Sequence, residues 1–170
     1  MQEINFQKIC STIKHSCYGS NLYTLRRGFC RTYDRAKPDT KIAYIETAEE
    51  ASQYGMKELP LCINVRFLFV TLCAYQFSKT EQKQSTKFKD VLEKLFNGKN
   101  SSESLKKRIE KLLSIERTDD SRFFKTLSYI IGIAHSEGLI VDERDLLETL
   151  CDWDNAPERI AKYIMSQQER

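Results

Sequence analysis

The chain has 170 residues, of which 41% are hydrophobic, so it can build one core or two small ones. Its net charge is only +3, which does not identify a partner by itself. No charged-then-apolar signal segment opens the sequence, and the most apolar run, residues 61–77, is interrupted by Asn64, Arg66 and Gln76. We therefore expect a cytoplasmic protein that does not span a membrane.

Helices are predicted throughout, because apolar residues recur at intervals of three and four and strand patterns are nearly missing. In chain order, the first two apolar stripes cover residues 6–17, before Gly19, and residues 22–29. Residues 33–47 contain the turn-forming triplet Lys-Pro-Asp and are predicted to form a loop.

The pair Thr47 and Glu50 has the form of a capping box, so a short helix is predicted to begin there and to end at Gly55. After Pro60, a helix is predicted from residue 61 to about residue 77. It is apolar on most faces, which is typical of a buried central helix. Residues 78–85 are polar and predicted to form a loop.

The second half of the chain continues the pattern. A helix over residues 88–96 is followed by a polar connection, residues 99–102, and then by a helix whose buried line is Leu105, Ile109 and Leu112. Further predicted helix starts are those with an aspartate at the cap or a proline in the first turn, namely Asp119 or Asp120, Asp142 and Pro157.

The sequence thus predicts an all-α fold, a compact bundle of eight or nine helices. The polar connection at residues 99–102 is the candidate boundary between an N-terminal helical half, 1–98, and a C-terminal helical half, 99–170. A single domain is the alternative to two packed halves.

Charge is distributed unevenly. Residues 1–37 carry seven bases and two acids, and residues 76–125 carry thirteen bases and eight acids. Residues 126–170 carry four bases and nine acids. Clustered cations of this kind suit a nucleic-acid backbone, although an ordinary solvated surface has a similar pattern.

The basic residues gain meaning when they are placed on helices. With Leu105 and Ile109 buried, a rotation of about 100° per residue puts Lys107, Arg108 and Lys111 together on the opposite flank. A solvated face supported by nearby glutamates is the alternative explanation. A second group surrounds the next helix start, where free N–H groups favour anions. It consists of Arg117, Arg122 and Lys125.

An arginine pair lies in the earlier helix. If Leu22, Leu25 and Phe29 are buried, Arg27 points outward, whereas Arg26 falls beside the apolar line and is expected to pack or pair internally. Tyr23 and Tyr33 are candidates for stacking on exposed bases, with packing as the more ordinary role of such residues.

Signals for catalysis are weak. The sequence has two histidines, His15 and His135, and it contains no phosphate loop, dinucleotide-binding glycine motif or zinc-protease motif. The cluster Cys10, His15, Cys17 and Cys30 lacks the ligand spacing of a zinc site. We therefore expect no enzymatic activity, no metal and no cofactor, and we interpret most cysteines as reduced core residues.

The order and spacing of the second-half motifs resemble those of the CasB family, the small subunit of the type I-E CRISPR surveillance complex called Cascade. The similar run is KKRIEKLLSIERTDDSRFFKTLSYIIGIAHSEGLIVDERDLLETLCDWD, residues 106–154, and the LRRG at residues 25–28 is similar to the family's N-terminal paired arginines. The resemblance covers about half of the chain by motif and all of it by length and helical pattern.

This resemblance implies a non-catalytic helical protein, present in two copies, that contacts the backbone and large subunits of the complex. It would support pairing of guide RNA with target DNA and hold the displaced strand, without reading sequence. The resemblance assigns phosphate contacts to Arg26, Arg27, Arg108 and Arg117. Charge geometry adds Lys107, Lys111, Arg122 and Lys125.

Two other functions remain open from the sequence. A protein adaptor would dock through the acidic surface of residues 126–170, with the basic segments merely solvated. A small metal-dependent hydrolase would depend on the Cys10, His15, Cys17 and Cys30 cluster.

Overall fold

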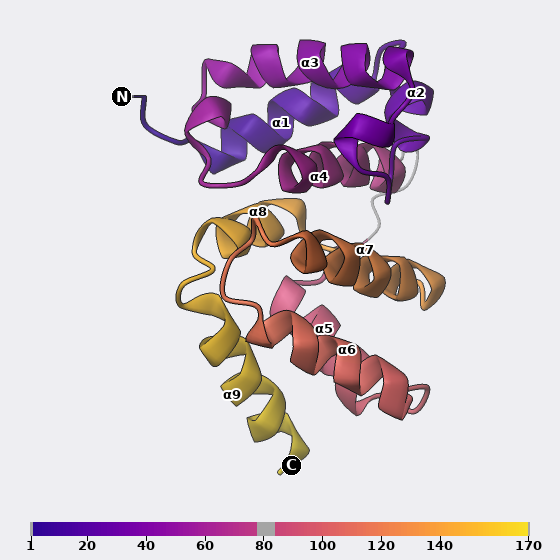
Figure 1. Ribbon diagram of the computed structural model, residues 1–170, viewed down its shortest axis with the longest axis vertical. Coiled ribbons are helices and arrows are strands. Elements are labelled where there is room, and N and C mark those ends of the chain that lie inside the picture. Colours follow the sequence, from indigo (N-terminus) through magenta and orange to yellow (C-terminus); the bar gives the residue numbers. More distant parts are fainter. Residues whose placement is uncertain (1, 78–83, 170) are drawn as a thin grey trace. The chain divides into compact units, whose positions relative to one another are not determined.

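The structure, a computed structural model, describes residues 2–77 and 84–169. Within these ranges it contains nine α-helices and two short 3-10 turns and no extended strand, which confirms the all-α prediction (Figure 1). The chain divides into two compact units, Met1–Gln82 and Lys83–Arg170.

The first unit is built around α4 (Ile63–Gln76), which is buried on nearly every side. Three helices pack around it and against one another, α1 (Phe6–Cys17), α2 (Leu22–Arg26) and α3 (Pro38–Ser52) (Figure 1). Nine of the fourteen residues of α4 are buried, including all of residues 67–74. The prediction of a buried central helix after Pro60 is therefore confirmed.

Helix α3 corrects two sequence-based predictions. Residues 38–47 are helical rather than a loop, and Pro38 occupies the first turn, where its missing N–H costs no hydrogen bond. Thr47 does not begin a helix, because it lies buried in the middle of α3 and its Oγ1 donates to the Ala43 carbonyl over 2.9 Å. The prediction failed because Pro38 was interpreted as a helix breaker when it is a helix starter.

A turn joins α3 to α4. Gly55 adopts a left-handed backbone with φ of 94° and begins a 3-10 turn, Met56–Glu58. An added Cβ would lie 2.8 Å from the Ile4 Cα, so a side chain here would collide with backbone. Gly55 thus shapes the turn, and α3 itself already ends at Ser52.

The second unit consists of five helices. They are α5 (Phe88–Asn97), α6 (Glu103–Ser114), α7 (Ser121–Ser136), α8 (Glu143–Cys151) and α9 (Ala156–Gln168). Helix α5 packs mainly against α9 and α6, and α6 packs against α7 (Figure 1). An isolated parallel bridge between Thr86 and Val141 ties the start of the unit to the segment just before α8.

The position of α5 explains why the units divide before it. The polar connection after Gly98 was expected to separate two halves, but α5 makes its main helix contacts with α9 and α6. The connection is an ordinary link between neighbouring helices, and the units divide instead between Gln82 and Lys83.

The predicted caps of the second unit are present. Asp120 accepts the Arg122 amide at the start of α7, and Asp142 accepts the Asp145 amide at the start of α8. Pro157 lies in the first turn of α9, as predicted.

Trp153 anchors the start of the α6–α7 connection. This residue is buried, and its Nε1 donates to the Ile115 carbonyl over 2.7 Å. Its ring meets Phe123 of α7 edge-on, with centroids 4.9 Å apart. The residue between α8 and α9 therefore fixes both ends of the α6–α7 connection.

In the part of the chain that the structure describes, no helix combines the length and the apolar character that a membrane span requires.

Candidate nucleic-acid interface

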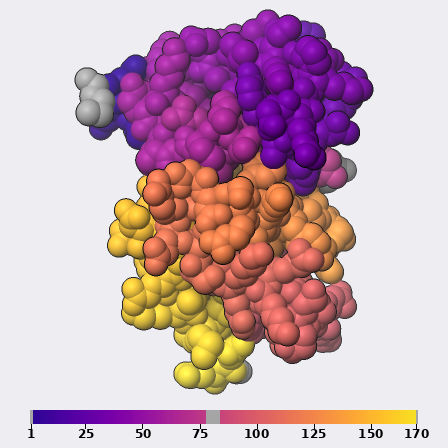
Figure 2. Space-filling model, viewed as in Figure 1, coloured from indigo at the N-terminus to yellow at the C-terminus, as the bar shows by residue number. Residues whose placement is uncertain are grey.

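Helices α6 and α7 run antiparallel, side by side (Figure 1), and both lie at the surface in the view of Figure 2. Their order follows from two interactions: Arg108 of α6 meets Tyr129 midway along α7, whereas Lys111 lies near Asp120 at the start of α7. Successive turns of α6 therefore face earlier turns of α7.

The α7 side of this surface is a single exposed line. Arg122, Lys125 and Tyr129 are exposed, and their spacing of three and four residues places them on one helix face. The opposite face of α7 is buried, with Phe123, Leu127 and Ile131 among its core residues. Because that face is buried in the core, the face that carries Arg122, Lys125 and Tyr129 points to solvent.

Arg108 spans the two helices. Its guanidinium lies over the Tyr129 ring, 3.8 Å from the centroid, within the range of a cation–π contact. This contact orients the planar group while the side chain stays exposed. An oriented guanidinium loses less conformational freedom when it binds a phosphate.

Asp120 is a fixed acid at the edge of this surface. The Arg122 side chain donates to it, with an Nη2–Oδ2 distance of 2.7 Å, and so does the Arg122 backbone amide. These hydrogen bonds lower the pKa of the Asp120 carboxyl from 3.8 to about 2, and Lys111 adds a smaller electrostatic contribution. Asp120 therefore remains ionised at neutral pH and neutralises part of the charge of Arg122.

The remaining cations have no such partner. Lys107, Lys111, Lys125 and Arg108 are exposed and form no ion pair with any described residue, and Arg108 lies over the Tyr129 ring. We call the group that faces solvent on these helices the α6–α7 basic surface. It comprises Lys107, Arg108, Lys111, Arg122 and Lys125.

Arg117 lies apart from these helix faces, in the connection between α6 and α7. It forms an exposed ion pair with Asp119 over 2.7 Å. Exposed pairs of this kind contribute little to stability, so the guanidinium can exchange its partner for a phosphate. Arg117 therefore lies next to the α6–α7 basic surface in the chain, and Asp119 neutralises its charge in the absence of a ligand.

Arg26 has an internal role. Its Nε donates to the Ala74 carbonyl over 2.8 Å, and its Nη2 donates to the Phe77 carbonyl over 2.5 Å. Carbonyls at the end of a helix have no intrahelical partner, so Arg26 of α2 caps the C-terminus of α4. The expectation of an internal contact holds, and we leave Arg26 out of the phosphate-binding set.

Arg27 points outward, as predicted, but it pairs with Asp39 at the start of α3 over 3.0 Å. Arg26 is thus used within the fold, whereas Arg27, like Arg117, is held in an exposed ion pair that a phosphate can replace. The sequence correctly placed Arg26 beside the apolar line and Arg27 facing outward, but it could not reveal their acceptors, which lie 12 to 51 residues away.

Tyr129 is the functional candidate that the sequence analysis missed. It is the aromatic support for Arg108, and it belongs to the exposed line that starts at Arg122. The spacing of seven residues between the two was available as a signal. It was overlooked because residues 123–134 were treated as one apolar helix.

The cysteine cluster has no metal-site geometry. Cys10 and Cys17 are buried on α1, whereas His15 and Cys30 are exposed. Among the described residues, no group of three or more histidine, cysteine, aspartate or glutamate side chains is close enough to hold a metal ion.

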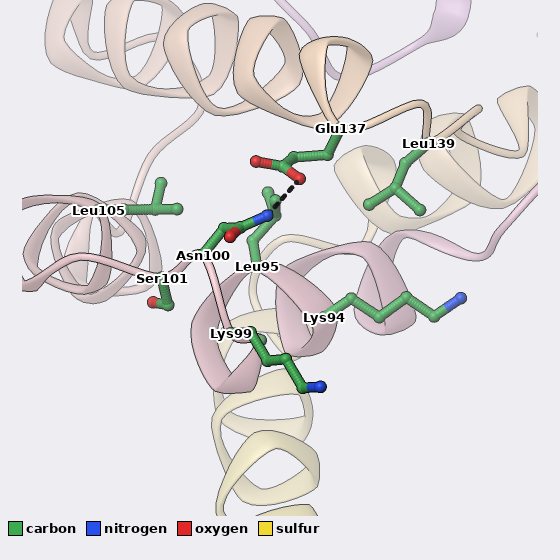
Figure 3. Close-up of a pocket in the computed structure, with 9 residues that line it drawn as sticks. Lys94, Leu95, Lys99, Asn100, Ser101, Leu105, Glu137 and Leu139 are labelled. Atoms are coloured by element: carbon green, nitrogen blue, oxygen red, sulfur yellow. Dashed lines mark hydrogen bonds between the residues drawn. The ribbon is translucent and has the colours of Figure 1, made fainter.

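A pocket of about 180 Å³ lies between α5, the start of α6 and the end of α7 (Figure 3). Asn100 donates to Glu137 across it over 3.2 Å, and Leu95, Leu105 and Leu139 supply its apolar lining. The side chains of Lys94 and Lys99 extend away from the Asn100–Glu137 pair (Figure 3). We interpret this pocket as a packing gap between the α5–α6 connection and the end of α7, which the Asn100–Glu137 hydrogen bond holds together.

Comparisons with known proteins give no match: no protein-family model, no curated protein and no solved structure is significantly similar to this chain.

Proposed function

We propose that this chain binds nucleic-acid backbone without sequence preference, as a non-catalytic subunit of a larger complex. The observation that carries the proposal is the α6–α7 basic surface, where four exposed cations are left without an ion pair among the described residues. Point-like ammonium groups and an oriented guanidinium suit phosphate oxygens. Contacts from such cations to phosphates position a strand and carry no sequence information.

The resemblance of residues 106–154 and 25–28 to the CasB family suggests a more specific role. In that role the chain is the small subunit of a CRISPR surveillance complex in the cytoplasm, paired with a second copy and bound to the backbone and large subunits. It stabilises the guide RNA–target DNA hybrid and the displaced strand. Exchange of a DNA duplex for the hybrid is nearly balanced, so modest backbone contacts can favour the open state.

The backbone-binding proposal is tested by equilibrium binding of the purified chain to unrelated single-stranded and duplex DNA and RNA of equal length. We expect affinities that differ little between sequences and that fall steeply as salt rises, by a slope of about −0.9 per phosphate contact on duplex DNA. Binding that survives high salt, or strong preference for one sequence, would contradict the proposal.

The CRISPR role needs its own test. The affinity-tagged chain is recovered from its native cells, and the RNA that accompanies it is sequenced. We expect short RNAs that share a repeat-derived end and differ in their spacer. If the accompanying RNA is absent or is a sample of total cellular RNA, the CRISPR role fails while backbone binding stands.

An adaptor function is the second candidate, and the charge of α8 and α9 favours it. The three basic residues of these helices each pair with a carboxylate, namely Arg144 with Glu148, Arg159 with Asp152 and Lys162 with Glu158. The region is therefore acidic after internal pairing and suits a basic protein partner. Partner binding that persists after nuclease treatment, without any affinity for nucleic acid, would support the adaptor function.

A further inference from the structure

Three tyrosines of the first unit are unusually exposed. The exposed fractions are 62% for Tyr18, 72% for Tyr23 and 46% for Tyr75. Other tyrosines of the unit behave differently: Tyr44 is buried, and Tyr33 packs edge-on against both Tyr44 and Phe67. Tyr33 is thus part of the packing, and Tyr23 is the stacking candidate of the sequence analysis that faces solvent.

Each exposed ring is supported by a neighbour. Tyr75 stacks on Phe29, with centroids 4.5 Å apart and an angle of 23° between the planes. Tyr18 contacts Phe77 edge-on at 4.9 Å. Such contacts restrict the rings before any ligand arrives, which reduces the entropy lost on binding.

Arg26 links the Tyr23 ring to the C-terminal end of α4, which carries Tyr75 and leads to Phe77. Its guanidinium carbon lies 5.6 Å from the centre of the Tyr23 ring, while its donors hold the carbonyls of Ala74 and Phe77. Phe77 in turn supports Tyr18, and Ala74 precedes Tyr75 in the chain. These contacts bring together the end of α1, helix α2 and the end of α4, and we call the three exposed tyrosines of these segments, Tyr18, Tyr23 and Tyr75, the tyrosine cluster.

Two exposed cations lie close in the chain to members of the tyrosine cluster. Lys14 is exposed on the last turn of α1, four residues before Tyr18, and Arg31 is exposed two residues after Phe29, on which Tyr75 stacks. Of the carboxylates of α3, Asp39 pairs with Arg27, whereas Glu46 accepts only the neutral Asn21 side chain over 3.3 Å and keeps its charge. An anionic strand can approach this part of the first unit.

We infer that the tyrosine cluster is a stacking site for unpaired nucleobases, an inference that rests on the proposed binding of nucleic acid. Flat rings beside cations match a single strand, whose bases offer π-faces and whose backbone is anionic. A helical protein partner would be better served by the aliphatic residues exposed elsewhere in this unit, Ile42 and Ile45 of α3. The site would hold the bases of a displaced or unpaired strand and not a duplex.

The test compares two ligands that differ only in their bases: an oligothymidylate and an abasic oligonucleotide of the same length and charge. The full chain is titrated with each by fluorescence anisotropy. Substitution of Tyr18→Ala together with Tyr23→Ala is expected to weaken oligothymidylate binding by about 5- to 100-fold, the range for loss of base stacking, and to leave abasic binding unchanged.

Matched variants exclude trivial causes. Tyr18→Phe with Tyr23→Phe keeps both rings and should retain binding of oligothymidylate. Ile42→Ala with Ile45→Ala removes two exposed apolar side chains from α3, 57% and 48% exposed, and should have no effect on either ligand. Circular dichroism confirms that each variant is folded before its affinity is compared.

The inference and the proposed function fail in different ways. If wild-type protein binds both oligonucleotides equally, or if the alanine pair weakens both equally, the tyrosine cluster does not stack on bases, whereas backbone binding stands. If the abasic oligonucleotide is not bound at low salt, backbone binding itself fails. Oligothymidylate binding that survives the alanine pair would also overturn the inference.

Discussion

Both the arginine pair, Arg26 and Arg27, and the α6–α7 basic surface were predicted from the sequence to bind phosphate. In the structure the arginine pair interacts with other parts of the chain, whereas most cations of the α6–α7 basic surface face solvent. Arg26 donates to two carbonyls at the end of α4, and Arg27 pairs with Asp39. In the α6–α7 basic surface, Lys107, Lys111 and Lys125 form no ion pair with a described residue. A cation whose donors are satisfied internally stabilises the fold, whereas one left in solvent is available to a ligand.

The contrast depends on local acceptors. Helix α2 lies against the C-terminus of α4, where unpaired carbonyls attract a guanidinium. Helices α6 and α7 are buried along their apolar faces, and Arg122 is the cation there that an acid, Asp120, holds closely. Stability assays and binding assays should therefore separate the two regions.

The largest effect on stability is expected for Arg26→Ala. The variant loses two charge-assisted hydrogen bonds to the end of α4, which we expect to lower the free energy of unfolding by about 2–4 kcal/mol. Urea denaturation measures this. Arg31→Ala, an exposed neighbour, should change it by less than about 0.5 kcal/mol. An Arg26→Ala protein of normal stability with weakened DNA binding would reverse the assignment of Arg26.

A mixed effect is expected for Arg108→Ala. Loss of the guanidinium removes one phosphate contact and the contact with Tyr129, which we expect to weaken binding of single-stranded DNA by about tenfold and to lower stability by about 0.5–1 kcal/mol. Arg108→Lys keeps the charge but not the planar fork, so it should recover only part of the affinity. Full recovery by lysine would show that the orientation of Arg108 by Tyr129 is unimportant.

A smaller effect, limited to binding, is expected for Lys125→Ala. Removal of one exposed ammonium should reduce the salt slope on duplex DNA by about one and leave unfolding unchanged. Lys162→Ala is the matched control, because Lys162 is also an exposed lysine on a helix but pairs with Glu158 over 2.9 Å. Equal slopes for the two variants would mean that net charge, and not position, determines binding.

The smallest effect concerns Asp120. Its pKa is lowered in the folded chain to about 2, so the interaction with Arg122 contributes stability above the ordinary carboxyl pKa near 3.8, and this contribution is lost as pH falls toward 2. Asp120→Asn should flatten the stability profile between about pH 5 and pH 2. The asparagine also frees the charge of Arg122, so DNA binding at pH 7 should strengthen slightly. Denaturation and titration across pH test both statements.

Much of this fold was predictable from the sequence because its signals are local. The apolar periodicity of residues 88–96 and the caps Asp120 and Asp142 give the helices of the second unit. The predictions failed at α3, because a proline such as Pro38 can either end a helix or occupy its first turn. They also failed at the unit boundary, which depends on packing of α5 against α9.

The candidate site was predictable only in part. Spacing placed Lys107, Arg108 and Lys111 together on α6, but nothing local showed that Arg122 and Lys125 would lie beside them on α7. The sequence also did not reveal interaction partners that lie far away in the chain. Such partners decide which cations are already occupied, as Arg26 is by the carbonyls at the end of α4.

The most direct test compares two triple variants that remove the same charge from the second unit. One is Arg108→Ala with Lys111→Ala and Lys125→Ala in the α6–α7 basic surface. The other is Arg144→Ala with Arg159→Ala and Lys162→Ala in α8 and α9. Each is titrated with duplex DNA across a salt series. We expect the first to reduce the salt slope by about three and the second to leave it near the wild-type value. Equal reductions, or none in the first, would contradict the assignment of phosphate binding to α6 and α7.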